Sequence, residues 1–244
     1  MLSLLLSCGS PIDHAPSMVA ALPADRVGSA KVIHVSSVDD FETARADINA
    51  ASQHSPAPES VVVVISAGVY DRPLPLQTDA LSEPIDLTVR GDGEVWFEDA
   101  GISVRGHDVT VTGLGFRGRV LQGSMVEVTA SGSVTVSDVR IQDAFLGQPY
   151  NGGIGGRSPS PEKPPRQGRG KRPKPSYGIA IHTSGLEPVT VKDVSAQRVK
   201  VHTDALVHVS ARPSVEVRLE TLTASDCSPV EPISVSDGVQ VIRP

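Results

Sequence analysis

Few residues in this sequence have the types and spacing that enzymes use for catalysis. His202 and Asp204 place a base and an acid two positions apart, and they form the candidate catalytic pair. Hydrolysis of a glycosidic bond generally needs two carboxylates at a set separation, and the sequence offers no identifiable partner for Asp204. It also contains no HExxH or CxxC pattern, so we expect neither a metal site nor a cofactor.

The positions of the other polar residues can be predicted from a repeat. A phrase of short apolar strands occurs five times, and its first strand carries Ile102/Val104, Val126/Val128, Ile179/Ile181, Val207/Val209 and Ile233/Val235. A second strand follows in each copy: Val109-Thr110-Val111, Val134-Thr135-Val136, Val189-Thr190-Val191, Val215-Glu216-Val217 and Val239-Gln240-Val241. The first four copies add a third strand. Short strands at a fixed period are typical of a solenoid, with a β-sandwich as the alternative.

The third copy begins late because a long segment separates it from the second. Residues 146–176 are rich in Gly, Pro and basic side chains, with Glu162 as their only acid, and they have no apolar period. Such a composition cannot bury enough apolar surface to form a core. We therefore expect a basic, disordered insertion at 146–176 within one domain at 31–244.

Alternation of the first strands predicts which residues face outward. With the apolar residues inside, one outward column is Ser103, Glu127, Ala180, His208 and Ser234, and the other is Arg105, Thr129, His182, Ser210 and Ser236. Neighbouring strands lie about 4.8 Å apart, so side chains on successive coils could contact one ligand. The predicted substrate-binding residues are Arg105, Glu127, His182 and His208.

The segment before the repeats carries a helix signal and a distinctive phrase. Ser37, with Asp40 three residues later, has the spacing of a capping box, and apolar residues fall on one helical face from Val38 to Ser52. The phrase Ile65-Ser66-Ala67-Gly68-Val69-Tyr70 then precedes the coils. Together, over about residues 31–244 without the insertion, these features resemble the right-handed parallel β-helix proteins of the pectate-lyase-like superfamily.

This resemblance implies a fold and a class of ligand. The fold is all-β: a right-handed parallel β-helix solenoid whose first coil is capped by the N-terminal α-helix. Members of that superfamily usually bind polysaccharide along the outer face, so the resemblance implies a shallow groove there. Among its enzymes, a lyase would need clustered acidic calcium ligands and a positioned Arg or Lys base; Arg105 could be that base, and the acidic cluster is not apparent in the sequence.

The first residues indicate a possible membrane anchor. Leu5-Leu6-Ser7-Cys8 resembles the processing box of a bacterial lipoprotein signal, in which Cys8 receives the lipid. The alternative is a disordered apolar N-terminus, since no Lys or Arg precedes the short apolar run. With the lipoprotein signal, we expect residues 1–8 to be a truncated signal and residues 9–30, rich in Pro, Ala and Ser, to be a tether. We expect the protein to be lipid-anchored at the bacterial cell envelope or secreted.

Charge narrows the choice of partner. The formal net charge is −6, and the basic residues concentrate in the insertion, which is unlike the basic face of a nucleic-acid-binding protein. We expect a non-catalytic module that binds polysaccharide, including anionic polymers, or serves as a scaffold, with self-association through the C-terminal coil as a further expectation. The alternative is a polysaccharide lyase, glycoside hydrolase or epimerase acting on acidic polysaccharide.

Overall fold

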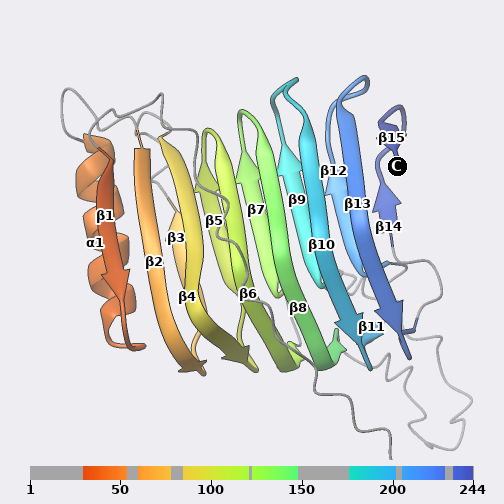
Figure 1. The fold of residues 1–244 in the computed structure, drawn as a ribbon. Helices are drawn as coiled ribbons and strands as arrows, with labels where there is room; N and C mark the ends of the chain where they lie inside the picture. Colours follow the sequence, from red (N-terminus) through yellow and green to blue (C-terminus); the bar gives the residue numbers. More distant parts are fainter. Residues whose placement is uncertain are drawn as a thin grey trace, which may run out of the picture.

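The chain winds into a parallel β-solenoid of about six turns (Figure 1). The computed structural model describes residues 30–53, 60–77, 85–120, 123–147, 176–201, 205–228 and 233–243. The all-β parallel β-helix with an N-terminal helix, as the repeat predicts, is confirmed. Cys8, His202, Asp204, the tether and nearly all of the insertion lie outside the described residues; Leu146, the expected first residue of the insertion, is instead buried in a strand.

Two sheets of parallel strands make up the solenoid wall. Sheet A contains β1 (Lys31–Val35), β2 (Ser60–Tyr70), β4 (Asp86–Glu98), β6 (Val109–Val120), β8 (Val134–Leu146), β10 (Val189–Gln197), β13 (Glu216–Ser225) and β15 (Gln240–Ile242), in that order, with β11 (Lys200–Val201) paired to β8. Sheet B runs from β3 (Leu74–Gln77) through β5 (Ile102–Gly106), β7 (Val126–Ala130), β9 (Ile179–Thr183) and β12 (Val207–Ser210) to β14 (Ile233–Val235). Figure 1 shows the helix α1 (Asp40–Gln53) at the end opposite the C-terminus.

The second and third strands predicted for each coil form one long strand instead. A residue with positive φ bends this strand between its two halves: Gly113, Asp138, Asp193 or Thr221, depending on the coil. Glycine adopts such a conformation freely, and aspartate does so more readily than most residues. Because a single residue makes the bend, strand pairing resumes directly after it. A turn that would separate two strands is therefore unnecessary.

Strand register agrees with the repeat, with one exception. Ile102 pairs with Val126, Val126 with Ile179, Ile179 with Val207 and Val207 with Ile233, as the alignment predicts. In the fourth copy, however, Val189 pairs with Val217 and not with Val215. A shift of two residues preserves the face on which each side chain lies, because strands have a side-chain period of two. The apolar pattern alone therefore could not distinguish the two registers.

Like residues stack inside the solenoid. The buried residues Tyr70, Phe97, Phe116, Ile141 and Ala196 occupy equivalent register positions on successive strands of sheet A, and the exposed Ala224 continues their register on β13. The first three rings are stacked, with centroids 5.5 Å apart between Tyr70 and Phe97 and 5.3 Å apart between Phe97 and Phe116. Offset-stacked rings at this spacing attract each other beyond their area burial. The side chains in this column become smaller toward the C-terminal end, from aromatic rings to alanine.

Helix α1 covers the first coil and extends the aromatic column. Its Phe41 is buried, and its ring stacks on Tyr70 with a centroid distance of 5.7 Å. The helix starts at Asp40, two residues after the predicted start at Val38. The Asp40 carboxylate accepts hydrogen bonds from the backbone N–H groups of Ser36 and Ser37, both at 2.8 Å, and these bonds lower the pKa of Asp40. This is the reciprocal bond of a capping box.

The opposite end of the solenoid is less fully covered. Ile233 and Val235 were predicted to point inward like their counterparts, yet both are only half-buried, and Ile242 is 40% exposed. Their interior neighbours Val207 and Val209, one coil earlier, are fully buried.

Among the described residues, no helix is long and apolar enough to cross a membrane.

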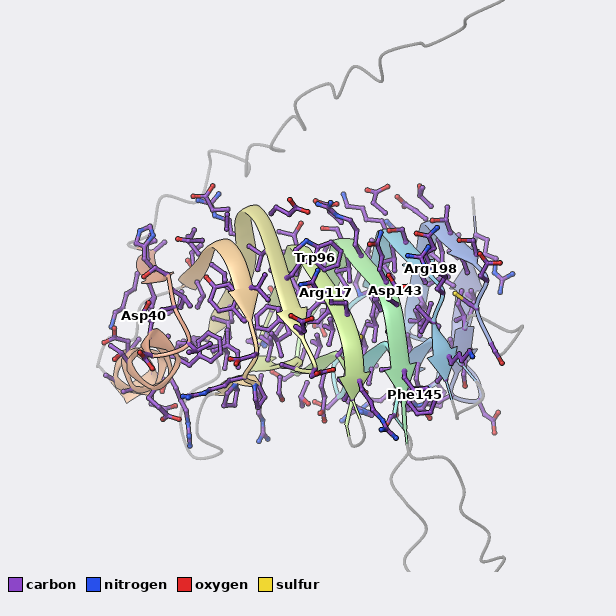
Figure 2. All side chains as sticks on the ribbon, turned by 90° about the horizontal axis from the view of Figure 1, so that it is seen from below. Asp40, Trp96, Arg117, Asp143, Phe145 and Arg198 are labelled. Carbon is purple, nitrogen blue, oxygen red and sulfur yellow. The ribbon has the colours of Figure 1, made fainter. Side chains whose placement is uncertain are left out.

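The outer side of the long strands is polar and stabilised by contacts between coils (Figure 2). Trp96 lies across Gly115 of the next strand, where an added Cβ atom would come within 2.6 Å of the indole ring. The Arg117 guanidinium lies 5.8 Å from the centroid of that ring. Further along, Arg198 donates two hydrogen bonds, of 2.5 and 2.8 Å, to the carboxylate of Asp143. Trp96 therefore packs on the surface, in contrast to its neighbour Phe97 in the core.

We expect Phe97→Ala to lower the free energy of unfolding by about 3–5 kcal/mol, because it opens a cavity within the stacked rings. Trp96→Ala removes an adjacent aromatic side chain from the outer surface and should have a smaller effect. Urea denaturation followed by circular dichroism measures both. Equal losses for the two variants would show that the aromatic column is not a principal source of stability.

Candidate functional site

The outward columns predicted for sheet B are present in the structure. Glu127 pairs with Ser103 on one side and Ala180 on the other, and Ala180 pairs with His208. In the second column, Thr129 pairs with Arg105 and with His182. Arg105, Glu127, His182 and His208 therefore share one face and lie on four consecutive strands, β5, β7, β9 and β12. Whether they bind a ligand stays a prediction.

The two histidines come together with a tyrosine that the sequence analysis did not single out. The rings of His182 and His208 meet edge to face, with centroids 6.2 Å apart. The His208 ring also stacks almost parallel on the Tyr177 ring, at a centroid distance of 4.6 Å and an interplanar angle of 11°. Ala180 is directed outward by its register but is only 3% exposed. Its register partners are His208 on one side and Glu127 on the other, and we attribute its burial to these larger side chains.

Burial governs the chemistry of His208. Its Nδ1 atom is inaccessible to solvent and, among the described residues, has no hydrogen-bond partner. Burial, and secondarily the proximity of His182, lowers the pKa of His208 below the usual value for histidine. Desolvation disfavours the charged form of a base. His208 is therefore a neutral ring at neutral pH.

A groove opens beside Glu127 on the same side of the molecule. It has a volume of about 450 Å³ and spans the starts of β3, β5 and β7, where the chain enters sheet B. Its polar lining comes mainly from Asp99, Arg119, Ser103, Ser124 and Glu127, and its apolar lining includes Pro73 and Pro75. Both charge signs and apolar surface are thus present in one open, shallow depression.

Backbone hydrogen bonds connect the groove to the ring cluster. The Tyr177 N–H donates to the hydroxyl of the groove residue Ser124 at 3.3 Å, and the Tyr177 carbonyl accepts from the N–H of Met125 at 3.2 Å. Gly101 also lies at this corner, where a Cβ atom would be 2.6 Å from the Ser124 carbonyl oxygen. The groove wall at Ser124, and the buried Met125 that follows it, are therefore held by the segment that carries Tyr177.

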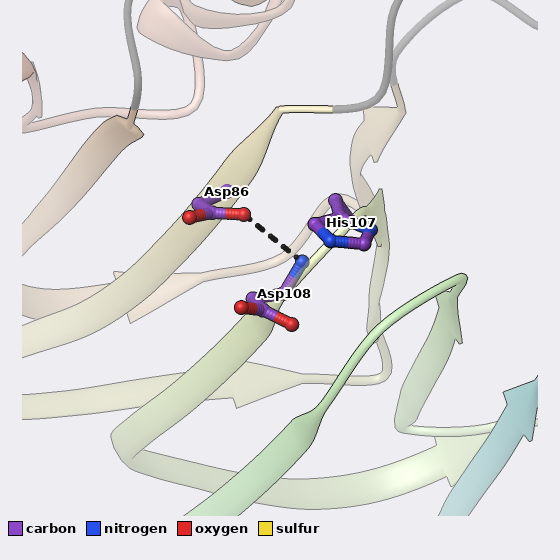
Figure 3. Close-up of side chains that lie close together, drawn as sticks. All are labelled: Asp86, His107 and Asp108. Carbon is purple, nitrogen blue, oxygen red and sulfur yellow. Dashed lines mark hydrogen bonds between the residues drawn. The ribbon is translucent and has the colours of Figure 1, made fainter. Parts of the chain in front are cut away.

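A second cluster of chemically capable side chains lies at the turn after β5 (Figure 3). One ligand atom each from Asp86, His107 and Asp108 lie within 4.8 Å of one another, an arrangement that could hold a metal ion. No metal site was expected from the sequence, which has no HExxH or CxxC pattern. This cluster leaves no such motif, because Asp86 belongs to the preceding coil. Asp86 Oδ1 accepts a hydrogen bond of 3.2 Å from the Asp108 N–H, the dashed line in the figure.

Hydrogen bonds also give this second cluster a structural role. Asp108 Oδ1 accepts from both the backbone N–H and the hydroxyl of Ser133, at 2.6 and 2.9 Å, and His107 Nδ1 lies 3.0 Å from the Ser131 hydroxyl. Asp86, Asp108 and Ser133 belong to three successive coils. Their hydrogen bonds join the three turns at one corner of the solenoid.

The remaining predicted site residues stay untested predictions. His202 and Asp204, the candidate catalytic pair, and Cys8, the candidate lipidation site, fall outside the described residues. Tyr177 was missed because it directly follows the segment that was assigned to the insertion. Its position immediately before the repeat phrase Gly178-Ile179 was the available signal.

Comparison with protein-family models, curated proteins and solved structures found no match to this chain.

We expect Asp108→Ala to lower the free energy of unfolding by about 1–3 kcal/mol, because it leaves the half-buried Ser133 N–H without its acceptor. Asp92→Ala, an exposed carboxylate elsewhere on the same solenoid, is the matched control and should change stability by less than about 0.5 kcal/mol. Thermal unfolding of both variants provides the measurement. If Asp108→Ala behaves like its control, the turn hydrogen bonds are not needed to join the coils.

Proposed function

We propose that this protein is a non-catalytic binding module that holds a polysaccharide along the outer face of sheet B. The observation that carries the proposal is the continuity between the groove at Glu127 and the Tyr177–His208–His182 cluster. Both lie on one face, and shared backbone hydrogen bonds connect them. The resemblance to pectate-lyase-like β-helix proteins supports polysaccharide as the ligand.

The dimensions of the face favour an extended ligand over a compact one. From Ser103 to His208 the column crosses three strand spacings, which amounts to about 14 Å at 4.8 Å per strand. The groove is open and shallow, whereas pockets for small molecules enclose most of the ligand surface. A polymer lying across the strands could contact Glu127, His182 and His208 in turn.

The chemistry of the face also suits sugars. Sugar hydroxyls both donate and accept hydrogen bonds, so they can pair with a carboxylate, a neutral imidazole or a serine hydroxyl. The flat rings of Tyr177 and His208 provide apolar surface at the same place. With the expected lipid at Cys8, the proposal places this module at the cell envelope.

A panel of acidic and neutral polysaccharides tests the proposal by affinity electrophoresis, with depolymerisation followed in parallel. Retention without depolymerisation is the expected result, and depolymerisation would instead support the enzyme alternative. Glu127→Ala and His182→Ala should each weaken retention about tenfold, the equivalent of losing one interaction worth about 1.4 kcal/mol.

Matched controls for these two variants lie away from the proposed face. Glu220→Ala removes an exposed carboxylate from β13, and His34→Ala removes an exposed histidine from β1. Both should retain polymer as the unaltered protein does. Wild-type retention by Glu127→Ala and His182→Ala together would contradict the assignment of this face.

A further inference from the structure

His208 occupies the central position in a chain of contacts that ends at the groove. Its ring is stacked on Tyr177, and the backbone of Tyr177 forms hydrogen bonds to Ser124, which lines the groove, and to its buried neighbour Met125. The next residue, Gly178, is closely packed: a Cβ atom there would lie 2.7 Å from the side chain of Leu206, just before β12, and its N–H donates to the Leu206 carbonyl at 2.9 Å. The position of Tyr177 is therefore sensitive to the position of the His208 ring.

The His208 ring can hold this position only while it is neutral. A neutral imidazole carries one N–H, so the buried Nδ1 can be the unprotonated nitrogen, whereas an imidazolium carries N–H groups at both positions. Protonation would place a charged N–H at an atom that has no solvent access and no partner among the described residues. Burying an unpaired charged donor costs far more than burying a lone pair. The protonated ring must therefore turn outward until Nδ1 reaches water.

Among the residues that the structure describes, none that faces His208 offsets this cost. On β9, the groups facing it are His182 and Ala180, and on β14 its register partner is Ser234. Tyr177 faces it with its aromatic ring, and the nearest described carboxylate in its column, Glu127, is two strands away, beyond Ala180. His182 would repel an imidazolium when it is itself protonated.

We propose that His208 is a proton-sensitive latch: its neutral ring holds Tyr177 and the groove wall in place, and its protonation releases both. The latch itself needs no ligand. Only its consequence for binding, a groove whose wall loosens in acid, rests on the proposed function.

The sign of the effect follows from the direction of the pKa shift. Because the pKa of His208 is lower in the folded protein than in the unfolded chain, the stacked state is at full stability above the unfolded value. It loses stability as the pH falls toward and through the folded value. The latch is therefore closed at neutral pH and opens only below the usual titration range of histidine.

Amide hydrogen exchange tests the latch in the full chain at pH 7.5 and 5.0, after correction for the intrinsic exchange rates. The amides of Met125 and Tyr177 should lose protection at pH 5.0 relative to the amides of Val109 and Val111, which lie in the core of sheet A. His34→Phe, which removes an exposed histidine, should show the same loss. Unchanged protection of Met125 and Tyr177 at the two pH values would overturn the proposal.

Two substitutions separate the ring from its proton. His208→Phe keeps an aromatic ring against Tyr177 and cannot titrate, so both amides should stay protected at pH 5.0. His208→Gln lacks the ring and should show low protection at both pH values. Loss of protection at pH 5.0 in a folded His208→Phe protein, or wild-type protection in His208→Gln, would contradict the latch. If His208→Phe does not fold by circular dichroism, the His208→Gln result decides.

A titration of His208 by NMR adds a readout that a purely structural role would not alter. His182→Gln should raise the midpoint, because it removes the neighbouring positive charge, and an unchanged or lower midpoint contradicts the arrangement. Polymer retention at the two pH values then tests the consequence. If no polysaccharide binds at either pH, the proposed function fails while the exchange data still decide the latch.

Discussion

Parallel, in-register stacking of equivalent strands is the constraint on which the rest of the structure depends. It places like side chains in continuous interior columns, of which Tyr70, Phe97 and Phe116 form the most tightly stacked. It also requires each coil to turn its corners at the same position. Residues such as Asp138 and Asp193 adopt positive φ at equivalent points for this reason. Loss of register in one coil would disturb both the columns and the corners of its neighbours.

The same stacking creates the candidate site. Residues that are far apart in sequence, such as Glu127, His182 and His208, share a face because their strands pair directly in sheet B. Function on a solenoid needs no dedicated pocket, since each coil contributes one or two side chains to a common surface. Through the contact between Tyr177 and His208, the proposed latch makes part of that surface sensitive to the protonation of His208. The apolar interior contributes no such group to the proposed latch.

The sequence predicts the interior of this fold better than its surface chemistry. Alternating valines and isoleucines specify which residues point inward, and their period identifies the outward columns correctly. The two-residue shift at Val215 could not be predicted in this way, because each side chain stays on the same face of the strand after the shift. The Asp86–His107–Asp108 cluster escapes because it depends on distances between turns of different coils, and the stacking of Tyr177 on His208 depends on side-chain conformation. Neither the distances between turns nor the side-chain conformations produce a periodic pattern in the sequence.

Paired cysteines test the parallel register most directly. In a background with Cys8 and Cys227 replaced by serine, Thr110 and Thr135 or Thr112 and Ser137 are changed to cysteine, each pair being in direct register. At one strand spacing of about 4.8 Å, the Cα separation of both pairs falls in the range that disulfides span, whereas the crossed pairs lie farther apart. The account predicts rapid oxidation of Thr110→Cys/Thr135→Cys and of Thr112→Cys/Ser137→Cys. Preferential oxidation of the crossed pairs, Thr110→Cys/Ser137→Cys and Thr112→Cys/Thr135→Cys, would show antiparallel strands and contradict it.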